Sequence, residues 1–419
     1  MRSRLVTRAT VLRGVQVPRR GNGIPLATRV STSRAVADFT GDTIDAHSPP
    51  AMTGPDFSDP RAGHRRQLLV QLINIPSVSH QERQLADWVE GQLRQVSRGE
   101  VLRVVDEVVF RFPALTGKPK IIFCGHLDTV PANDNLSARV EGDRVYGLGS
   151  SDLKAGLAVF LDLVATLDPA ALHVDPVFLF YTCEEVAYHE SGLLVIQREL
   201  PELLEDTRFA ICVEPTDNAV ELGCLGNLQA EVTVHGKAAH SARPWLGANA
   251  IHAAVPLIAK IAAVPERAVD FGERVRYREV VGATTIAGGR ARNVIPDAVH
   301  VNVNFRFAPD RSGDDAVAWM RELVGDAGTI EVKDLSPAGR VPSENSFCRA
   351  LVAAAGGTVR AKQAWTDVGR FTAWGIDAVS CGPGIPAQAH QKDEYATMTA
   401  MTESVALFER FLYDMGESK

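Results

Sequence analysis

Cysteine is scarce in this 419-residue sequence, which has six cysteines and no C-x-x-C spacing. The missing spacing, with four of the cysteines in or beside apolar runs, speaks against a disulfide framework. Long apolar runs are missing as well, because no stretch reaches the roughly 18 residues that a transmembrane helix needs. We therefore expect buried, reduced thiols in a cytoplasmic protein that has no membrane partner.

An excess of positive charge is also absent. The formal net charge is −7 at pH 7 and the isoelectric point is about 5.9, which argues against a nucleic-acid partner. With 45% hydrophobic and 23% charged residues, the composition is that of an ordinary globular protein. The length predicts more than one domain.

Residues 1–37 contain no aspartate, glutamate or lysine but eight arginines. Such a segment could be an organelle transit peptide, a disordered tail or translated upstream sequence. No apolar segment of the kind found in secretory signals follows it. We interpret residues 1–51 as a disordered extension and expect the folded protein to begin near Met52.

Four apolar runs predict buried strands at residues 121–124, 177–181, 209–213 and 378–381. Helix-like segments such as LKAGLAVFLDLVATL separate the first three runs. Buried strands that alternate with helices are typical of a mostly parallel α/β sheet with helices on both faces.

The pattern changes between residues 225 and 336. In AVHVNVNFRFA, apolar and polar residues alternate strictly, which is typical of antiparallel strands with one solvated face. Two long helical segments could cover the apolar face. We therefore expect an inserted α+β domain at 225–336 that divides a catalytic α/β domain into 52–224 and 337–419.

Acids and histidines follow the buried runs at the ends where ligands bind in open α/β sheets. Two-residue patterns recur by chance, and His126 with Asp128 could merely form a turn. Alternatively, the carboxylate of Asp128 could hold one imidazole nitrogen while the other binds a metal. The full set is His126, Asp128, Asp152, Glu184, Glu185, Glu214 and His390.

This mixed nitrogen and oxygen ligand set suits two zinc ions. Each ion would need a histidine and a carboxylate, and a further carboxylate would bridge them around a shared water. Five ligands suffice: His126, His390, Asp152, Glu185 and Glu214. One of the two adjacent glutamates, Glu184 or Glu185, then remains as a general base.

Over residues 65–415 the chain resembles the co-catalytic zinc aminoacylases and carboxypeptidases. That family includes acetylornithine deacetylases and succinyl-diaminopimelate desuccinylases, and the motifs are most similar to desuccinylases of actinobacterial type. The motifs that carry the resemblance occur in the family's order: GHLDTVP, GSSDLKAG, TCEEVA, VEPT, GKAAHSARP, RNVIPD, FRFAP and AHQKDE.

The resemblance implies a role for each residue of the metal site. His126 and Glu214 would bind one zinc ion, Glu185 and His390 would bind the other, and Asp152 would bridge them, with Co²⁺ or Mn²⁺ as possible replacements. Asp128 would orient His126. Glu184 would be the acid and base that deprotonates the attacking water and protonates the leaving amine.

The resemblance also implies a homodimer that forms through the inserted domain, which acts as a lid. His240 would enter the partner's active site and stabilise the oxyanion. Four further residues would bind the carboxylates of a small N-succinyl amino acid substrate: Asn293, Arg306, Thr366 and Arg370.

The implied reaction is the hydrolysis of N-succinyl-LL-2,6-diaminopimelate to succinate and LL-2,6-diaminopimelate, a step of lysine biosynthesis. The alternatives with the same chemistry are an acetylornithine deacetylase, an aminoacylase and a dipeptidase. An alternative of another class is a non-catalytic homologue that binds without turnover, which the complete ligand set disfavours.

Overall fold

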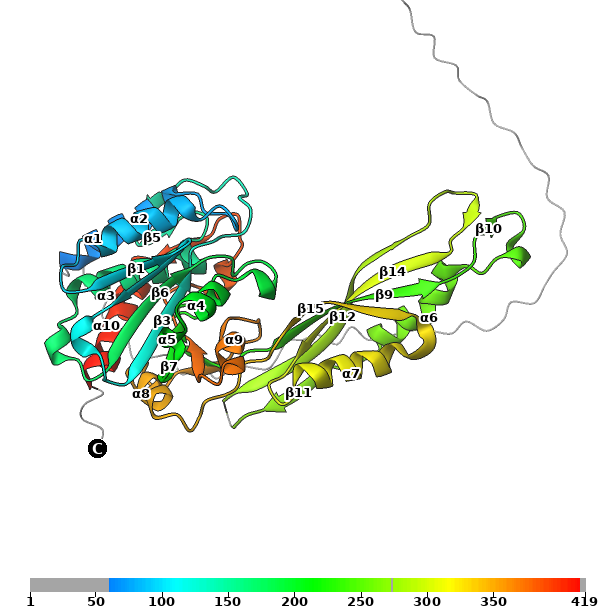
Figure 1. Cartoon of the computed structure of the whole chain (residues 1–419). Coiled ribbons are helices and arrows are strands. Elements are labelled where there is room, and N and C mark those ends of the chain that lie inside the picture. Colours follow the sequence, from blue (N-terminus) through cyan, green and yellow to red (C-terminus); the bar gives the residue numbers. More distant parts are fainter. Residues whose placement is uncertain (1–59, 273, 415–419) are drawn as a thin grey trace, which may run out of the picture. The chain divides into compact units, whose positions relative to one another are not determined.

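A computed structural model describes residues 60–272 and 274–414 (Figure 1). The expected extension at 1–51 lies outside this range. Within the described part of the chain, none of the helices has the length and apolar character needed to cross a membrane. The six cysteines are all buried and free, as the sequence predicted.

The larger sheet has eight strands. Its central strands β6, β3, β7 and β17 run parallel, whereas β1 and β2 pair antiparallel with their neighbours. Strand β8 pairs antiparallel with β17 and parallel with β16, so the sheet is mixed. The two strands of the β1–β2 hairpin follow each other too closely for the long crossover that parallel pairing requires. In spatial order the strands are β1 (Glu100–Val104), β2 (Glu107–Arg111), β6 (Asp175–Tyr181), β3 (Lys120–His126), β7 (Thr207–Cys212), β17 (Ala378–Ser380), β8 (Val220–Leu222) and β16 (Val359–Ala361).

Helices cover both faces of this sheet, as the sequence predicted. Successive residues of β3 point to opposite faces, so Phe123 joins one buried apolar cluster and Ile122 joins another. The cluster around Phe123 includes α1 (Pro60–Asn74), α2 (Arg83–Leu93), α3 (Ala155–Thr166), α8 (Ser346–Ala354) and α10 (Met398–Asp414). The cluster around Ile122 includes α4 (Leu193–Glu199), α5 (Pro201–Leu204) and α9 (Val368–Ala373).

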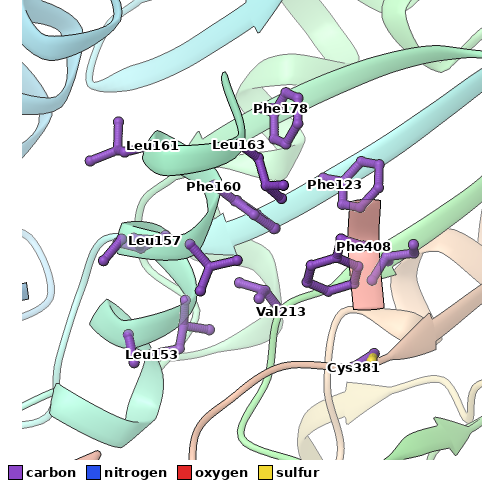
Figure 2. Packing of buried hydrophobic residues seen from close by; sticks show 14 of the residues in the cluster. Phe123, Leu153, Leu157, Phe160, Leu161, Leu163, Phe178, Val213, Cys381 and Phe408 are labelled. Atoms are coloured by element: carbon purple, nitrogen blue, oxygen red, sulfur yellow. The ribbon is translucent and has the colours of Figure 1, made fainter. Parts of the chain in front are cut away.

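Aromatic packing holds the end of β3 in place (Figure 2). The ring of Phe123 stacks on Phe178 at 5.1 Å between centroids and meets Phe160 and Phe408 edge-on at 5.8 and 5.5 Å. Full burial of one such side chain contributes about 1.5–3 kcal/mol. Because Phe123 lies three residues before His126, this core fixes where the first candidate ligand emerges.

A second sheet of five antiparallel strands uses residues between Gly226 and Ser336 only. The helices α6 (Ala250–Ala262) and α7 (Gly313–Val324) pack on its apolar face, which confirms the inserted α+β fold. The domain boundaries at 224/225 and 336/337 stay predictions. In spatial order the strands are β11 (Arg267–Asp270), β12 (Arg276–Gly288), β14 (Ala298–Phe307), β9 (Gly226–His235) and β15 (Thr329–Ser336).

Two smaller sheets lie beside or carry candidate residues. The strands β18 (Tyr395–Thr397), β5 (Arg144–Tyr146) and β4 (Arg139–Glu141) form one of them. The pairing of β18 with β5 brings the chain after His390 beside the chain before Asp152. The other sheet consists of β10 (Ala239–His240) and β13 (Val294–Ile295).

Candidate metal centre

The carboxylate of Asp128 organises one side of the site. His126 is the last residue of β3, and its Nδ1 lies 3.4 Å from Asp128 Oδ1. The same carboxylate accepts hydrogen bonds from the backbone amides of Glu184 and Glu185, each at 3.0 Å, and from Ser79 Oγ at 2.8 Å. Asp128 therefore holds both the imidazole and the turn that presents the two glutamates.

Asp152 lies between the two histidines. Its Oδ1 is 3.5 Å from His126 Nε2, and its Oδ2 is 3.5 Å from His390 Nε2. Glu185 Oε1 is 2.9 Å from the same nitrogen of His390. Two groups of ligand atoms each fall within 4.8 Å: His126 with Glu184 and Glu185, and Asp152 with Glu185 and His390. His126, Asp152, Glu185 and His390 thus converge, with Asp152 between the two histidines.

Glu214 follows β7 and is buried, yet its Oε1 has no hydrogen-bond partner among the described residues. It lies outside both ligand groups but lines the same cavity of about 380 Å³ as Asp152, Glu184, Glu185 and His390. A buried carboxylate oxygen without a partner is costly. A cation bound in the cavity would satisfy it, so the residues fit a metal ion.

Burial and neighbouring charges shift the acids in different directions. Burial raises the pKa of Asp152, but the imidazoles of His126 and His390 outweigh burial and lower that pKa below its usual range. Burial, followed by the charge of Glu214, raises the pKa of Glu184 well above its usual value. Burial also raises the pKa of Glu214 to about 7. Opposed shifts within one cavity are typical of acid–base sites.

Glu394 holds the backbone around Asp152, a role that the sequence did not reveal. Its carboxylate accepts hydrogen bonds from the amides of Gly149, Ser151 and Asp152 at 2.8, 2.8 and 2.9 Å. Burial raises the pKa of Glu394 to about 7. The one available signal was its place in AHQKDE, four residues after His390.

Two more glutamates support the turn that carries Glu184, and the sequence did not reveal them either. Glu107 on β2 accepts from both the amide and the hydroxyl of Thr182 at 2.8 Å. Glu82 accepts from the amide of Cys183 at 3.1 Å. Because these acceptors are carboxylates, they bind the turn more firmly than neutral groups would.

Two of the predicted substrate-binding residues lie in the α/β domain. Thr366 lines the cavity, and its Oγ1 is 3.4 Å from Ser380 Oγ. Arg370 is fully buried: its Nε donates to Asp367 Oδ1 at 2.6 Å, and its Nη2 donates to the carbonyl oxygen of Tyr188 at 2.7 Å. Some of the N–H donors of Arg370 are therefore already hydrogen-bonded within the protein.

The other predicted residues lie in the inserted domain. His240 on β10 is exposed and pairs with Val294, and the amide that follows His240 donates to the carbonyl oxygen of Asn293 at 2.9 Å. Arg306 on β14 donates to Asn304 Oδ1 at 3.2 Å. The structure brings His240 and Asn293 together, but neither they nor Arg306 are among the described residues that line the cavity.

His126, Glu184, Glu185 and Glu214 lie at the carboxyl ends of β3, β6 and β7, and Asp152 and His390 contact this group from other segments. Such a set of side chains is typical of a metal-dependent hydrolase. The chain belongs to Peptidase family M20/M25/M40, whose sequence pattern matches residues 122–414.

Among the relatives is a Mycobacterium tuberculosis protein provisionally named as the succinyl-diaminopimelate desuccinylase DapE. It is 44% identical over 349 residues, which cover 83% of this chain and 97% of that protein. The succinyl-diaminopimelate desuccinylase of Corynebacterium glutamicum is 40% identical over 353 residues, which cover 82% of this chain and 95% of that protein.

Solved structures share the fold at low sequence identity. Aminopeptidase PepT from Bacillus cereus matches with a TM-score of 0.70 and 16% identity, over 85% of this chain and 99% of that chain. A Bacillus subtilis protein described as a dinuclear metal binding peptidase from the M20 family matches with a TM-score of 0.62 and 18% identity, over 85% and 99% of the two chains.

Proposed function

We propose that this enzyme hydrolyses N-succinyl-LL-2,6-diaminopimelate to succinate and LL-2,6-diaminopimelate, a step of lysine biosynthesis in the cytoplasm. The observation that carries this proposal is the 44% and 40% identity, over more than four fifths of the chain, to proteins named for this reaction. The free, buried thiols suit a reducing compartment.

The proposed cofactor is a pair of zinc ions. His126 and Glu214 would hold one ion, and Glu185 and His390 would hold the other, with Asp152 shared between them. When bound, the ions supply positive charge that polarises the amide carbonyl and lowers the pKa of a water molecule.

Glu184 is the proposed acid and base. It takes a proton from the attacking water and returns it to the nitrogen of the amide as the bond to the acyl carbon breaks. Burial and the Glu214 charge raise the pKa of Glu184, which suits a group that must both accept and release a proton. Asp128 fixes its position through the Glu184 amide.

The inserted domain is the proposed homodimer contact. Through it, His240 would serve the partner's site, and Asn293 beside it would approach the same substrate. This arrangement accounts for the distribution of predicted residues, because His240 is exposed on β10 and does not line the cavity of its own chain. Arg306, Thr366 and Arg370 remain the proposed contacts for substrate carboxylates.

A substrate comparison tests the proposed function. Zinc-loaded enzyme is incubated with N-succinyl-LL-diaminopimelate and, separately, with N-acetylornithine, and the released primary amine is measured. We expect kcat/KM to be much higher for the succinyl substrate. A preference for N-acetylornithine would leave the hydrolytic chemistry intact and refute the proposed substrate.

A further inference from the structure

A buried lysine stands in the cavity of the metal centre. Lys362 directly follows β16, and its Nζ lies 3.2 Å from Glu221 Oε2 on the neighbouring strand β8. Both residues are buried, at 8% and 7% exposure. They line the same cavity as Glu184 and Glu214, and Lys362 is the only lysine or arginine among the described residues that line it.

This placement of a lysine is energetically costly. An ammonium group loses its hydration when it is buried, and one ion pair often fails to compensate fully. Packing alone does not explain a charged side chain in this place, because an apolar residue would fill the same volume at lower cost. The ion pair with Glu221 also engages only part of an ammonium group that has three N–H donors.

The negative charge of the cavity disfavours an acyl group that ends in a carboxylate. Five acids line it: Asp152, Glu184, Glu185, Glu214 and Glu221. Metal ions would offset the charge of their own ligands, but an incoming carboxylate beyond them needs a separate cation. In a succinyl group two methylene groups separate that carboxylate from the amide carbonyl, so it must bind close to the site of hydrolysis.

We propose that Lys362 binds the acyl carboxylate of the substrate and thereby selects N-succinyl over N-acetyl substrates. This inference rests on the proposed function. Glu221 holds the ammonium group in place before the substrate arrives. The cavity wall beside Lys362 includes Ala361, Ala364 and Trp365, whose apolar surfaces suit the two methylene groups of the acyl chain.

A purely structural role would have a different signature. If Lys362 only balanced the charge of Glu214, its loss would weaken metal binding and slow every substrate alike. If it selects the acyl group, its loss affects only substrates that carry the second carboxylate. Two substrates with the same leaving amine, N-succinyl- and N-acetyl-LL-diaminopimelate, separate these possibilities.

The test compares kcat/KM for both substrates in the wild type and in Lys362→Met, with bound zinc measured in each protein. We expect a fall of about 10- to 100-fold for the succinyl substrate, the effect of losing one hydrogen bond between charged groups, and less than about threefold for the acetyl substrate. Zinc content should not change. Lys333→Met, which removes an exposed lysine paired with Glu331, is the control and should alter neither value.

Equal losses on both substrates, or no loss on either, would overturn the role of Lys362. A wild-type enzyme that prefers the acetyl substrate would instead refute the proposed function, so the two failures are read from different proteins. If Lys362→Met does not fold, the double variant Lys362→Met with Glu221→Gln avoids a buried unpaired acid and tests the same ratio. Lys362→Arg should restore part of the succinyl preference.

Discussion

Glu184 and Glu185 are neighbours in sequence but differ in their surroundings. Glu185 contacts His390 at 2.9 Å and belongs to both groups of candidate ligand atoms. Glu184 belongs to only one group, and burial raises its pKa well above the usual value. The residues alone left open which glutamate is the base, and these contacts support Glu184.

Replacement of Glu184 by glutamine should separate catalysis from metal binding. The side-chain amide of glutamine cannot accept and return a proton as a carboxylate does. We therefore expect kcat to fall by about 10²- to 10⁴-fold while the zinc content stays at the wild-type level. Elemental analysis and steady-state kinetics measure the two quantities. Glu185→Gln is the matched comparison and should lose zinc. Near-normal turnover in the Glu184 variant would refute its assignment.

Glu107 should make stability depend on pH. Burial raises its pKa to about 7, from an ordinary value of 4.5, so the folded state binds more protons than the unfolded state between these values. Stability therefore falls as the pH rises through this window, by at most about 3 kcal/mol.

Glu107→Gln removes this titration, so the loss of unfolding free energy between pH 5 and pH 8 should be smaller than in the wild type. Urea denaturation at the two pH values measures it. The control is Glu202→Gln, because Glu202 is exposed. If the pH dependence of Glu107→Gln matched that of the wild type, Glu107 would not be its source.

The sequence predicted the candidate ligands better than the residues that hold them. His126 and Glu214 could be found because each closely follows a buried apolar run. Glu394 could not, because its partners are backbone amides, and one of them lies 245 residues away in the sequence. No local pattern distinguishes a carboxylate that accepts such bonds from one that is solvated.

At the scale of elements, the strands that coincide with apolar or alternating runs of the sequence were predictable, and β8 and β16 were not. The apolar runs became β3, β6, β7 and β17, and the alternating segment became β14. Strands β8 and β16 have three residues each, too few to show a period. The sequence therefore did not reveal the antiparallel pairing of β8 with β17, one of the pairings that make the sheet mixed.

Helix α3 lies unusually close to the segment that carries Glu214. A Cβ atom on Gly156 would lie 2.7 Å from Val213 Cγ1 and 2.9 Å from the carbonyl oxygen of Val213. We expect Gly156→Ala to lower the free energy of unfolding by about 1–3 kcal/mol. Because Glu214 follows Val213 directly, kcat should fall as well.

Gly91→Ala is the matched control for this prediction. Gly91 lies within α2, and nothing is within 4 Å of the position its Cβ would take. Alanine there should raise the free energy of unfolding by up to about 1 kcal/mol through helix propensity alone. Denaturant titration compares the two variants. Equal changes in the free energy of unfolding would show that the close approach of α3 to Val213 does not affect stability.

At the scale of the molecule, the inserted domain offers a surface for the proposed homodimer. Strand β11 pairs only with residues 276–279 of β12, so the rest of that edge has no strand beside it within the described chain. Exposed apolar residues of this domain include Ile286 on β12, and Ile251 and Val255 on α6, a helix that contacts β12. Free strand edges and exposed apolar side chains are typical of interfaces.

Light scattering should show a dimer, and Val255→Asp should shift it toward monomer with loss of activity. Val140→Asp, an exposed valine on β4, is the control. Mixing Glu184→Gln with His240→Ala protomers gives a sharper test. One site of each mixed dimer would combine intact Glu184 with intact His240 from its partner, so activity should return. No recovery in confirmed mixed dimers would refute the sharing of His240.

The order of the site residues along the chain bears on how the enzyme is made. His126, Asp152, Glu185 and Glu214 all precede the five-stranded sheet, whereas His390 and Glu394 follow it. A ribosome must therefore synthesise the entire insertion before the last histidine and the support for Asp152 emerge. A nascent chain can fold its first strands early, but we expect it to stay inactive until the segment with His390 and Glu394 has emerged, which keeps an incomplete hydrolase from acting.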